Sequence, residues 1–369
     1  MPMKTDKTSK IILKTQLKTG MTIYQNLKDK RRICDTRYIG EPSTDRFTPH
    51  KYTEADGKLL LKKPERDFVI LNITDPHYSD YDKRFFYAFH AEETIKKLVK
   101  ETDPDLITVT GDIVCGQSGV YSIDRFCDLL ESFGIPWAPV FGNHDDETNC
   151  DLNYLGDRFL SCGHCLFRKG DPAMGAGNYI LHIAEQRENG AFNYIESMLM
   201  MYHKDGHPND KQKEWFSWAA EGIKKLSDNK AEVSIWMHIP LPEYQYAFNE
   251  AYDEAAGGWR ASFEAAGEIH ERICCERRDG LPYQRGFFDL IKASGNTKQV
   301  FCGHEHLNDF SLLYQGVRLT YLLKVGKGSG AGFGLNGCSV IRIGSNGIKR
   351  ISHRAYNGIK TYNKADIIL

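Results

Sequence analysis

The stretch "LNITDPHYSD", residues 71–80, ends an apolar run with a proline set between an aspartate and a histidine. Its first four residues, 71–74, are typical of a buried strand. Asp-Pro is also an ordinary turn signal, so the polar ending has a purely structural explanation when it is taken alone. The rest of the chain decides whether Asp75 and His77 carry out chemistry.

From Asp67 onward, short β-branched runs alternate with helical patterns. The runs "DFVILNIT", "DLITVTGD" and "PWAPVFGNHD" predict three strands, and "HAEETIKKLVKET" and "IDRFCDLLESFG" predict the helices between them. This order predicts right-handed crossovers and a largely parallel, buried sheet. In such sheets ligands bind beyond the carboxyl ends of the strands, so the loops after these three strands form the expected site.

The second half of the chain has a different organisation. Residues 145–177 are predicted to be a long loop-rich segment, followed by two strands, a helix over 210–226 and strands that end before His238 and His304. Two more strands surround the glycine-rich residues 326–337. That stretch is predicted to be a loop and not a nucleotide cradle, because it neither follows a first βαβ strand nor opens a helix.

The loops after the predicted strands carry carboxylate, amide or imidazole groups. These are Asp75, His77, Asp112, Asn143, His144, His238, His304 and His306. Each group alone is explained by a turn or a surface loop, but their joint placement favours a metal site. Oxygen and imidazole ligands without thiolates suit zinc, manganese or iron better than copper(I) or an iron–sulfur cluster. Seven of these eight residues as ligands would exceed what one tetrahedral ion needs, so two metals sharing a carboxylate are predicted.

The blocks "DPH", "GD", "GNHD", "MH" and "GHEH", in this order, resemble the signature of the calcineurin-like metallophosphoesterases over residues 68–342. "HIPLPEY" and "GHEHLNDF" resemble especially the purple-acid-phosphatase-like, Dcr2-type branch. The resemblance implies an α/β (α+β) fold, a four-layer αββα sandwich of two mixed β-sheets flanked by helices. It also implies one metal on Asp75, His77 and His306, a second on Asn143, His238 and His304, Asp112 bridging both, and His144 beside the site without being a ligand.

The function implied by the resemblance is hydrolysis of phosphate esters at a dinuclear centre of iron, manganese or zinc. A hydroxide bridging the two metals would attack phosphorus, with Asp112 and His144 as the catalytic residues. Phosphomonoesters are favoured over diesters, and the expected substrate is a small molecule or a phosphoprotein. The alternatives are a binding scaffold of the same fold without turnover, which is free to lose ligands, and a nuclease, which needs a basic groove.

Two departures from the family pattern concern the bridging aspartate and the amino terminus. Cys115 stands three residues after Asp112, where purple acid phosphatases have a metal-binding tyrosine and protein Ser/Thr phosphatases an aspartate that orients the catalytic histidine. The partner that orients His144 is therefore unidentified. Residues 1–66 are too few for a separate β-sandwich domain, so they are predicted to be a short strand-bearing extension packed on the main domain, residues 67–369.

Composition bounds the environment of the protein. Its 369 residues carry 48 Lys and Arg against 49 Asp and Glu, so no overall charge attracts nucleic acid or a membrane. No secretory signal or spanning segment is evident, which favours a cytoplasmic protein with most of its ten cysteines reduced and buried. The pair Cys162-Gly-His-Cys165 lacks a thioredoxin-like context and a second pair for zinc, so it is interpreted as structural.

Residues around the predicted metals are assigned from their positions alone. Asp145, Glu305 and Asn308 are candidates for tuning the ligands. The pocket walls are predicted from Tyr78, Glu243, Tyr244 and the loops 145–177 and 246–280. Trp259 and Arg260 are suited to stacking a base or holding a phosphate, but ordinary packing is favoured for this pair.

Overall fold

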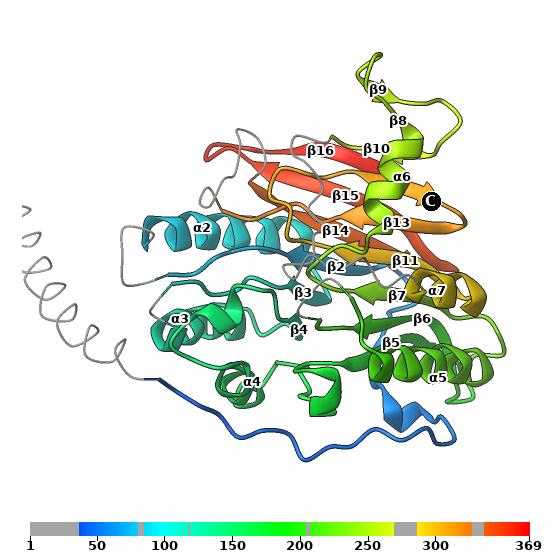
Figure 1. Ribbon diagram of the computed structural model, residues 1–369, viewed down its shortest axis with the longest axis horizontal. Helices are drawn as coiled ribbons and strands as arrows, with labels where there is room; N and C mark the ends of the chain where they lie inside the picture. Colours follow the sequence, from blue (N-terminus) through cyan, green and yellow to red (C-terminus); the bar gives the residue numbers. More distant parts are fainter. Residues whose placement is uncertain (1–36, 80–84, 117–118, 204–206, 269–285, 327–335) are drawn as a thin grey trace, which may run out of the picture.

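Two main β-sheets lie face to face, and helices cover their outer faces (Figure 1). The computed structural model describes residues 37–79, 85–116, 119–203, 207–268, 286–326 and 336–369. The predicted α/β class, with two mixed sheets flanked by helices, is confirmed. Within these ranges no helix combines the length and the apolar character needed to cross a membrane.

The six-stranded sheet contains the strands that the first half of the sequence predicts. In spatial order its members are β16 (Thr361–Ile368), β15 (Gly347–Tyr356), β14 (Gly337–Gly344), β2 (Phe68–Ile73), β3 (Leu106–Thr110) and β4 (Trp137–Val140). β2, β3 and β4 are parallel, while β14 pairs antiparallel with β2. Every residue of β2 and β3 is buried, as expected for parallel strands covered on both faces.

The eight-stranded sheet is assembled mostly from the second half of the chain. Its order is β1 (Lys58–Leu61), β5 (Tyr179–Gln186), β6 (Phe192–Met200), β7 (Glu232–Trp236), β11 (Thr297–Cys302), β13 (Val317–Tyr321), β12 (Ser311–Tyr314) and β10 (Ala265–Ala266). β6, β7, β11 and β13 run parallel. Their carboxyl ends therefore meet at one edge, which is where His238 and His304 follow.

The helices pack on the outer faces of the two sheets. Their bounds are α2 (Phe85–Thr102), α3 (Gly119–Glu131), α4 (Leu152–Leu160), α5 (Asp210–Leu226), α6 (Glu243–Ala251) and α7 (Phe287–Ser294). α2 contacts β2 and β14, α5 contacts β6, and α7 contacts β11. α5 begins with a capping box between Asn209 and Gln212, and α7 ends at Gly295 with φ 73°, a left-handed conformation that glycine adopts without strain.

Two large apolar clusters hold these layers together. One joins residues of both sheets with residues of α2 and α3, among them Ile70, Ile341, Met198, Trp236, Ile95 and Phe126. The other fills the space between the eight-stranded sheet and α5, α6 and α7. Because both sheets are packed on two sides, polar loops are confined to the strand ends.

Several segments differ from their sequence-based description. Residues 145–177 contain α4 and two 3-10 turns, η2 (Asp145–Glu147) and η3 (Pro172–Met174), since Asp151 caps a short amphipathic helix there. α6 is followed by the two-stranded β8 (Tyr252–Asp253) and β9 (Gly258–Trp259). Parts of the predicted loops, residues 269–285 and 327–335, lie outside the described residues.

The amino-terminal part of the described chain includes η1 (Glu54–Asp56) and β1. β1 pairs parallel with β5 and so extends the eight-stranded sheet. The Tyr52 hydroxyl is hydrogen-bonded to His182 Nε2 of β5 at 3.0 Å, and the Tyr52 ring lies against Trp218 of α5. The predicted boundary at residue 66 stays a prediction, because residues 1–36 lie outside the described residues.

Glu196 is a buried carboxyl group on β6, away from the strand-end loops. Burial raises its pKa to about 8, and Glu232 adds to the effect. The unfolded chain loses this proton at an ordinary pKa near 4.5, while the folded chain retains it up to about pH 8. The unfolded state therefore binds fewer protons between these values, and the group costs stability as pH rises.

We predict that Glu196→Gln changes the free energy of unfolding little at pH 5 but raises it by on the order of a few kcal/mol at pH 8. Urea denaturation of both proteins at the two pH values measures this. Glu214→Gln, at an exposed glutamate of α5, is the control and should show no such pH dependence. A Glu196→Gln effect that is equal at pH 5 and pH 8 would contradict the assignment.

Candidate metal centre

The predicted site residues follow the carboxyl ends of five strands. Asp75 and His77 follow β2, Asp112 follows β3, Asn143 and His144 follow β4, His238 follows β7, and His304 and His306 follow β11. The first three strands belong to one sheet and the last two to the other. The loops meet where the edges of the two sheets lie together, so residues up to 231 positions apart in the chain reach one another.

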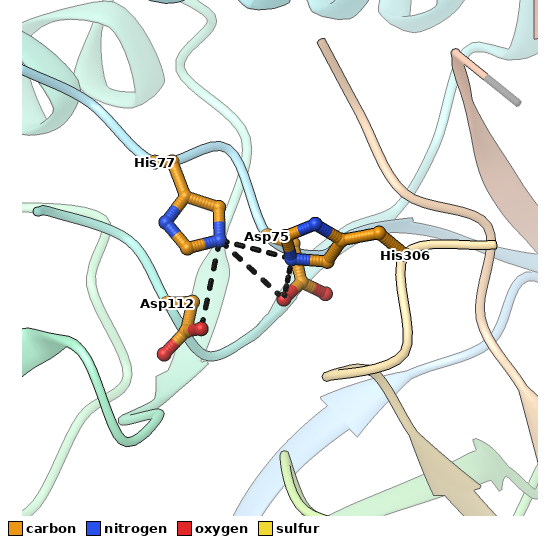
Figure 2. Close-up of side chains that lie close together, drawn as sticks. All are labelled: Asp75, His77, Asp112 and His306. Atoms are coloured by element: carbon orange, nitrogen blue, oxygen red, sulfur yellow. Dashed lines mark hydrogen bonds and ion pairs between the residues drawn. The ribbon is translucent and has the colours of Figure 1, made fainter. Parts of the chain in front are cut away.

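Asp75, His77, Asp112 and His306 form the first group of converging side chains (Figure 2). The Nε2 atoms of His77 and His306 lie 3.1 Å apart. His306 Nε2 is 3.3 Å from Asp75 Oδ1, and His77 Nε2 is 3.6 Å from Asp112 Oδ2. Two imidazole nitrogens and two carboxylates thus point at one small volume, as the ligands of a cation do.

Asp112, His238 and His304 form the second group. His238 Nε2 lies 3.2 Å from Asp112 Oδ2 and 3.3 Å from His304 Nδ1. The other ring nitrogen of His238 interacts with the backbone oxygen of Thr110 at 2.8 Å, which fixes the ring. Asp112 is the residue that both groups share, and its carboxylate lies between them.

Two side-chain oxygen atoms of the predicted ligands make no hydrogen bond among the described residues. They are Oδ1 of Asp75 and Oδ1 of Asn143, and both are buried. An unpaired buried acceptor is costly, and a cation is a partner that satisfies it. This observation and the mixed oxygen and nitrogen donor set show that the residues fit hard or borderline metal ions.

The backbone is held in an unusual conformation at four site residues. Asp75, His77, Asp112 and His304 have φ values of 53°, 46°, 49° and 75°. Left-handed backbone is unfavourable for residues with a Cβ and persists where the surrounding structure enforces it. The Asp75 amide donates to Gly111 O at 3.2 Å, and the His77 amide donates to Asp112 O at 3.0 Å, so the two loops hold each other in place.

Gly142 and Gly303 let two more loops approach the carboxylates closely. A Cβ atom on Gly142 would lie 2.2 Å from Asp112 Oδ1, and one on Gly303 would lie 2.7 Å from Asp75 Oδ2. Neither carboxylate could keep its place beside a larger residue. These glycines therefore belong to the site although they have no side chain to contribute.

Opposing charges at the site shift the pKa values of its members. Burial acts against ionisation, yet His238 holds the pKa of Asp75 and that of Asp112 below their usual range. Burial likewise lowers the pKa of His238, but Asp112 and Asp75 outweigh it and raise that pKa to about 10. Burial lowers the pKa of His77 to about 3. A proton on His238 thus offsets the carboxylates, and a cation bound there would compete with that proton.

Asp145 holds the loops that carry Asp112 and Asn143. It is fully buried, accepts from the amides of Ile113 and Val114 at 2.8 and 2.9 Å, and accepts from Gly142 N at 2.7 Å. Burial, with Asp112 nearby, raises its pKa to about 7. This placement supports the sequence-based interpretation of Asp145 as a residue that positions the ligands.

The other supporting candidates differ in their placement. Glu305 and Asn308 are buried beside His304 and His306 in sequence. Lys324, which sequence analysis missed, is also buried and donates to Asp75 O at 2.6 Å. The local sequence around Lys324 gives no sign of this role. Lys324 reaches Asp75 because the loop after β13 packs against the loop after β2.

Glu147 is the partner of His144 that the sequence left unidentified. His144 Nδ1 lies 2.5 Å from Glu147 Oε2, while His144 Nε2 lies 4.0 Å from Asp112 Oδ2. The backbone amide of His144 also donates to Asp112 Oδ1 at 2.8 Å. The i,i+3 spacing of the pair across η2 is a signal that sequence analysis overlooked. Cys115 Sγ contacts the backbone oxygen of His77 at 3.5 Å.

His203 is another residue that sequence analysis did not single out. It follows β6, whose carboxyl end lies beside that of β7, and its electrostatic neighbours include His238 and His304. Its ring is buried, with Nε2 3.3 Å from Met237 Sδ. The signal for it was its place three residues beyond a strand end, the same place that drew attention to the other histidines.

The predicted pocket walls need correction at two tyrosines. Tyr78 and Tyr244 are both fully buried. The ring of Tyr78 packs edge-on against Phe126, and the hydroxyl of Tyr244 donates to Val300 O at 2.8 Å. Both belong to the core because their rings turn inward from the loop and from α6, so they do not line a pocket. Glu243 begins α6 and is half-buried.

Trp259 and Arg260 make ordinary packing contacts, which sequence analysis favoured over base stacking or phosphate binding. Trp259 lies against Phe248 and Phe310, and its Nε1 donates to Gly267 O at 3.0 Å. Arg260 Nη1 is 3.9 Å from Asp253. The pair therefore stabilises the β8–β9 hairpin.

Comparisons with known proteins found several similar chains. "Probable inactive purple acid phosphatase 14" of Arabidopsis thaliana is 26% identical over 297 residues, 69% of each chain. "Phosphatase DCR2" of Saccharomyces cerevisiae is 23% identical over 317 residues, 77% of this chain and 51% of the yeast protein. A dimetal phosphatase from Danio rerio has a TM-score of 0.49 at 11% identity, covering 81% of this chain and 99% of the other.

The family model described as "Calcineurin-like phosphoesterase" matches residues 68–308, more than half of the chain. This range includes every residue of the two converging groups. The relatives named above agree with the resemblance to purple-acid-phosphatase-like and Dcr2-type proteins. The chain therefore belongs to the calcineurin-like phosphoesterase family.

Proposed function

We propose that this chain hydrolyses phosphate monoesters in preference to diesters, at a centre that takes two iron, manganese or zinc ions. The observation that carries the proposal is the position of Asp112, whose carboxylate belongs to both groups of converging side chains. Asp75, His77 and His306 would hold one ion, and Asn143, His238 and His304 the other. When bound, two such ions neutralise phosphoryl oxygens and make a bound water acidic enough to supply a nucleophile.

The chain's own residues would prepare the site for that chemistry. Asp112 brings negative charge to the point shared by both ions, while Asn143 offers a neutral oxygen that adds no charge. The left-handed backbone and the close glycines keep the ligands in place before a substrate arrives. Preorganised groups of this kind need no rearrangement during the reaction.

His144 would act on the substrate without holding a metal. Glu147 accepts from its Nδ1 and sets the orientation of the ring, so that Nε2 is left to contact the phosphoryl group or to protonate the leaving oxygen. The side chain of His144 is 40% exposed, whereas that of His77 is 5% exposed. This exposure suits a group that must meet a substrate entering from solvent.

A binding scaffold without turnover is the main alternative, because some relatives are named probable inactive phosphatases. Retention of every candidate ligand and of His144 with its carboxylate partner favours turnover. A nuclease gains no support from the near-neutral charge balance. A cytoplasmic location and a small-molecule or phosphoprotein substrate remain predictions.

A direct test combines elemental analysis with a substrate panel. The purified chain is loaded with manganese, zinc or iron, its metal content is measured, and hydrolysis of aryl monoesters, diesters and nucleotides is compared. We expect two ions per chain and the highest kcat/KM on a monoester. A chain that holds two ions and hydrolyses none of these esters would favour the scaffold.

Asp112→Ala should lower both metal occupancy and turnover sharply, since it removes the ligand that the two groups share. Elemental analysis and aryl phosphate hydrolysis measure the two effects. Asp210→Ala, at an exposed carboxylate of α5, is the matched control and should change neither. Full occupancy by two ions in Asp112→Ala would rule out the bridging role.

His144→Ala should leave metal content unchanged and lower kcat by roughly 10²–10⁴-fold, the usual effect of a positioned acid–base group. The loss should be greater on an alkyl phosphate than on an aryl phosphate, because an alkoxide needs a proton to depart. Steady-state kinetics on both esters measure this difference.

The control for His144→Ala is His164→Ala, since His164 is another half-exposed histidine whose Nδ1 lies 3.0 Å from a carboxylate, that of Glu131. It should retain full activity. Glu147→Gln should reduce kcat less than His144→Ala does, because it disturbs orientation only. Loss of a metal ion from His144→Ala would show that His144 is a ligand.

A further inference from the structure

Three free cysteines gather beside α3 and α4, in a region that the metal centre does not use. Cys127 lies on α3, and Cys162 follows the end of α4. The backbone of Cys165 forms an isolated β-bridge with Trp137 of β4. Cys127 is fully buried, whereas Cys162 is half-buried and reaches solvent. This cluster contains the Cys162-Gly-His-Cys165 motif that sequence analysis interpreted as structural.

A guanidinium group is fixed against the Cys162 sulfur. Arg158 Nη1 lies 3.1 Å from Cys162 Sγ. Arg158 is itself held by two carboxylates of α3, with Nε 2.7 Å from Asp124 Oδ1 and Nη2 3.1 Å from Asp128 Oδ1. Because the arginine is tied to α3 from both sides, its positive charge stays beside the thiol.

The two sulfur atoms of Cys127 and Cys162 have opposite electrostatic settings. Hydrogen bonding from Cys127, with help from Arg158 and against burial, lowers the pKa of Cys162 to about 7. Burial raises the pKa of Cys127, and Cys162 adds to that shift. A half-buried thiol beside a cation favours reaction, while the buried thiol behind it keeps its proton.

We propose that Cys162 is a redox-sensitive site that forms a reversible disulfide with Cys127 when it meets a small peroxide. The Cys162 thiolate attacks hydrogen peroxide, giving a sulfenic acid and hydroxide. The Cys127 sulfur then attacks the Cys162 sulfur while its proton passes to the departing hydroxyl, which forms the S–S bond and releases water. Two thiols are oxidised to one disulfide and one peroxide is reduced to water, so atoms and electrons balance.

The geometry favours Cys127 over Cys165 as the second cysteine. Residues between Cys162 and Cys165 are pinned, because Glu131 accepts from the amides of Gly163 at 3.0 Å and His164 at 3.1 Å. The following chain is tied to β4, where Leu166 N donates to Trp137 O at 2.8 Å. The turn is therefore held from both ends, whereas the side chains of Cys127 and Cys162 already share a hydrogen bond.

The bridge would join α3 to the segment after α4. α3 begins shortly after the loop that carries Asp112, and α4 follows the loop that carries Asn143 and His144. The closed loop would therefore contain β4 and the His144 loop. The proposal concerns the thiols alone and is independent of phosphoesterase activity.

Peptide mapping of the oxidised chain tests the proposal. The full, metal-loaded protein is treated with a few equivalents of hydrogen peroxide, its remaining thiols are alkylated, and it is digested without reductant. We expect one new peptide pair joined through Cys127 and Cys162, lighter by two hydrogens than the separate peptides and released by dithiothreitol. A bridge from Cys162 to Cys165 or to any other cysteine would overturn the proposed pairing.

Variants separate the role of Cys162, which reacts with peroxide, from that of Cys127, which completes the disulfide. Cys127→Ser should leave a sulfenic acid at Cys162 that dimedone labels, and Cys162→Ser should abolish the bridge. Cys338→Ser, at a buried cysteine of β14, is the control and should change neither result. If Cys127→Ser does not fold, alkylation rates in the unaltered chain decide, since Cys162 should react with iodoacetamide many times faster at pH 7 than Cys338. Equal rates would overturn the proposal.

Arg158→Gln tests the part played by the guanidinium. It should slow alkylation of Cys162 at pH 7 several-fold and have little effect at pH 9.5, where the thiol ionises without help. Arg158→Lys, which keeps a positive charge, should retain part of the rate. An alkylation rate unchanged in Arg158→Gln at pH 7 would show that the guanidinium does not activate Cys162.

Discussion

Two carboxylates, Asp75 and Asp112, are buried side by side at the edge where the two sheets meet. Burying like charges together is expensive unless positive charge and hydrogen bonds accompany them. Imidazoles from both sheets, a proton on His238 and the amide groups of neighbouring loops meet that requirement in the chain itself. The arrangement is one that cations would complete, and most other features of this edge serve to maintain it.

The fold supports this burial through a rigid frame. Every residue of β2 and β3 is buried, so the loops that follow them start from fixed points. Asp145 ties the Asp112 loop to the Gly142 loop, and the left-handed residues hold their conformation because neighbouring loops bond to their backbone. A large apolar core thus supports a small number of unfavourable local conformations, as is common at functional sites.

Names given to relatives do not decide whether this chain turns over substrate. Some relatives are named probable inactive phosphatases and another a phosphatase. The proposed turnover rests on a few atoms: the shared carboxylate of Asp112, the unpaired oxygen of Asn143, and His144 with its partner Glu147. His144 lies beside Asp112 and is paired with Glu147, which is the physical basis for proposing an enzyme over a scaffold.

Sequence patterns were sufficient for the parts of the structure that depend on local periodicity. Apolar runs and helical spacing predicted the strands and helices around Asp75 and Asp112, and the order of polar residues after the strands predicted which side chains would meet. Short elements escaped prediction, because α4 and the β8–β9 hairpin are too brief for a clear periodic signal and depend on caps and packing.

Tertiary structure alone decided which polar and aromatic residues face the site and which face the core. Tyr78 and Tyr244 looked like pocket walls in the sequence, but each ring turns inward where apolar space is available. Lys324 and His203 reach the site only because distant strands end side by side, and Cys127 meets Cys162 only because α3 packs against α4. Such pairings depend on contacts between segments far apart in the chain, which no local pattern of residues encodes.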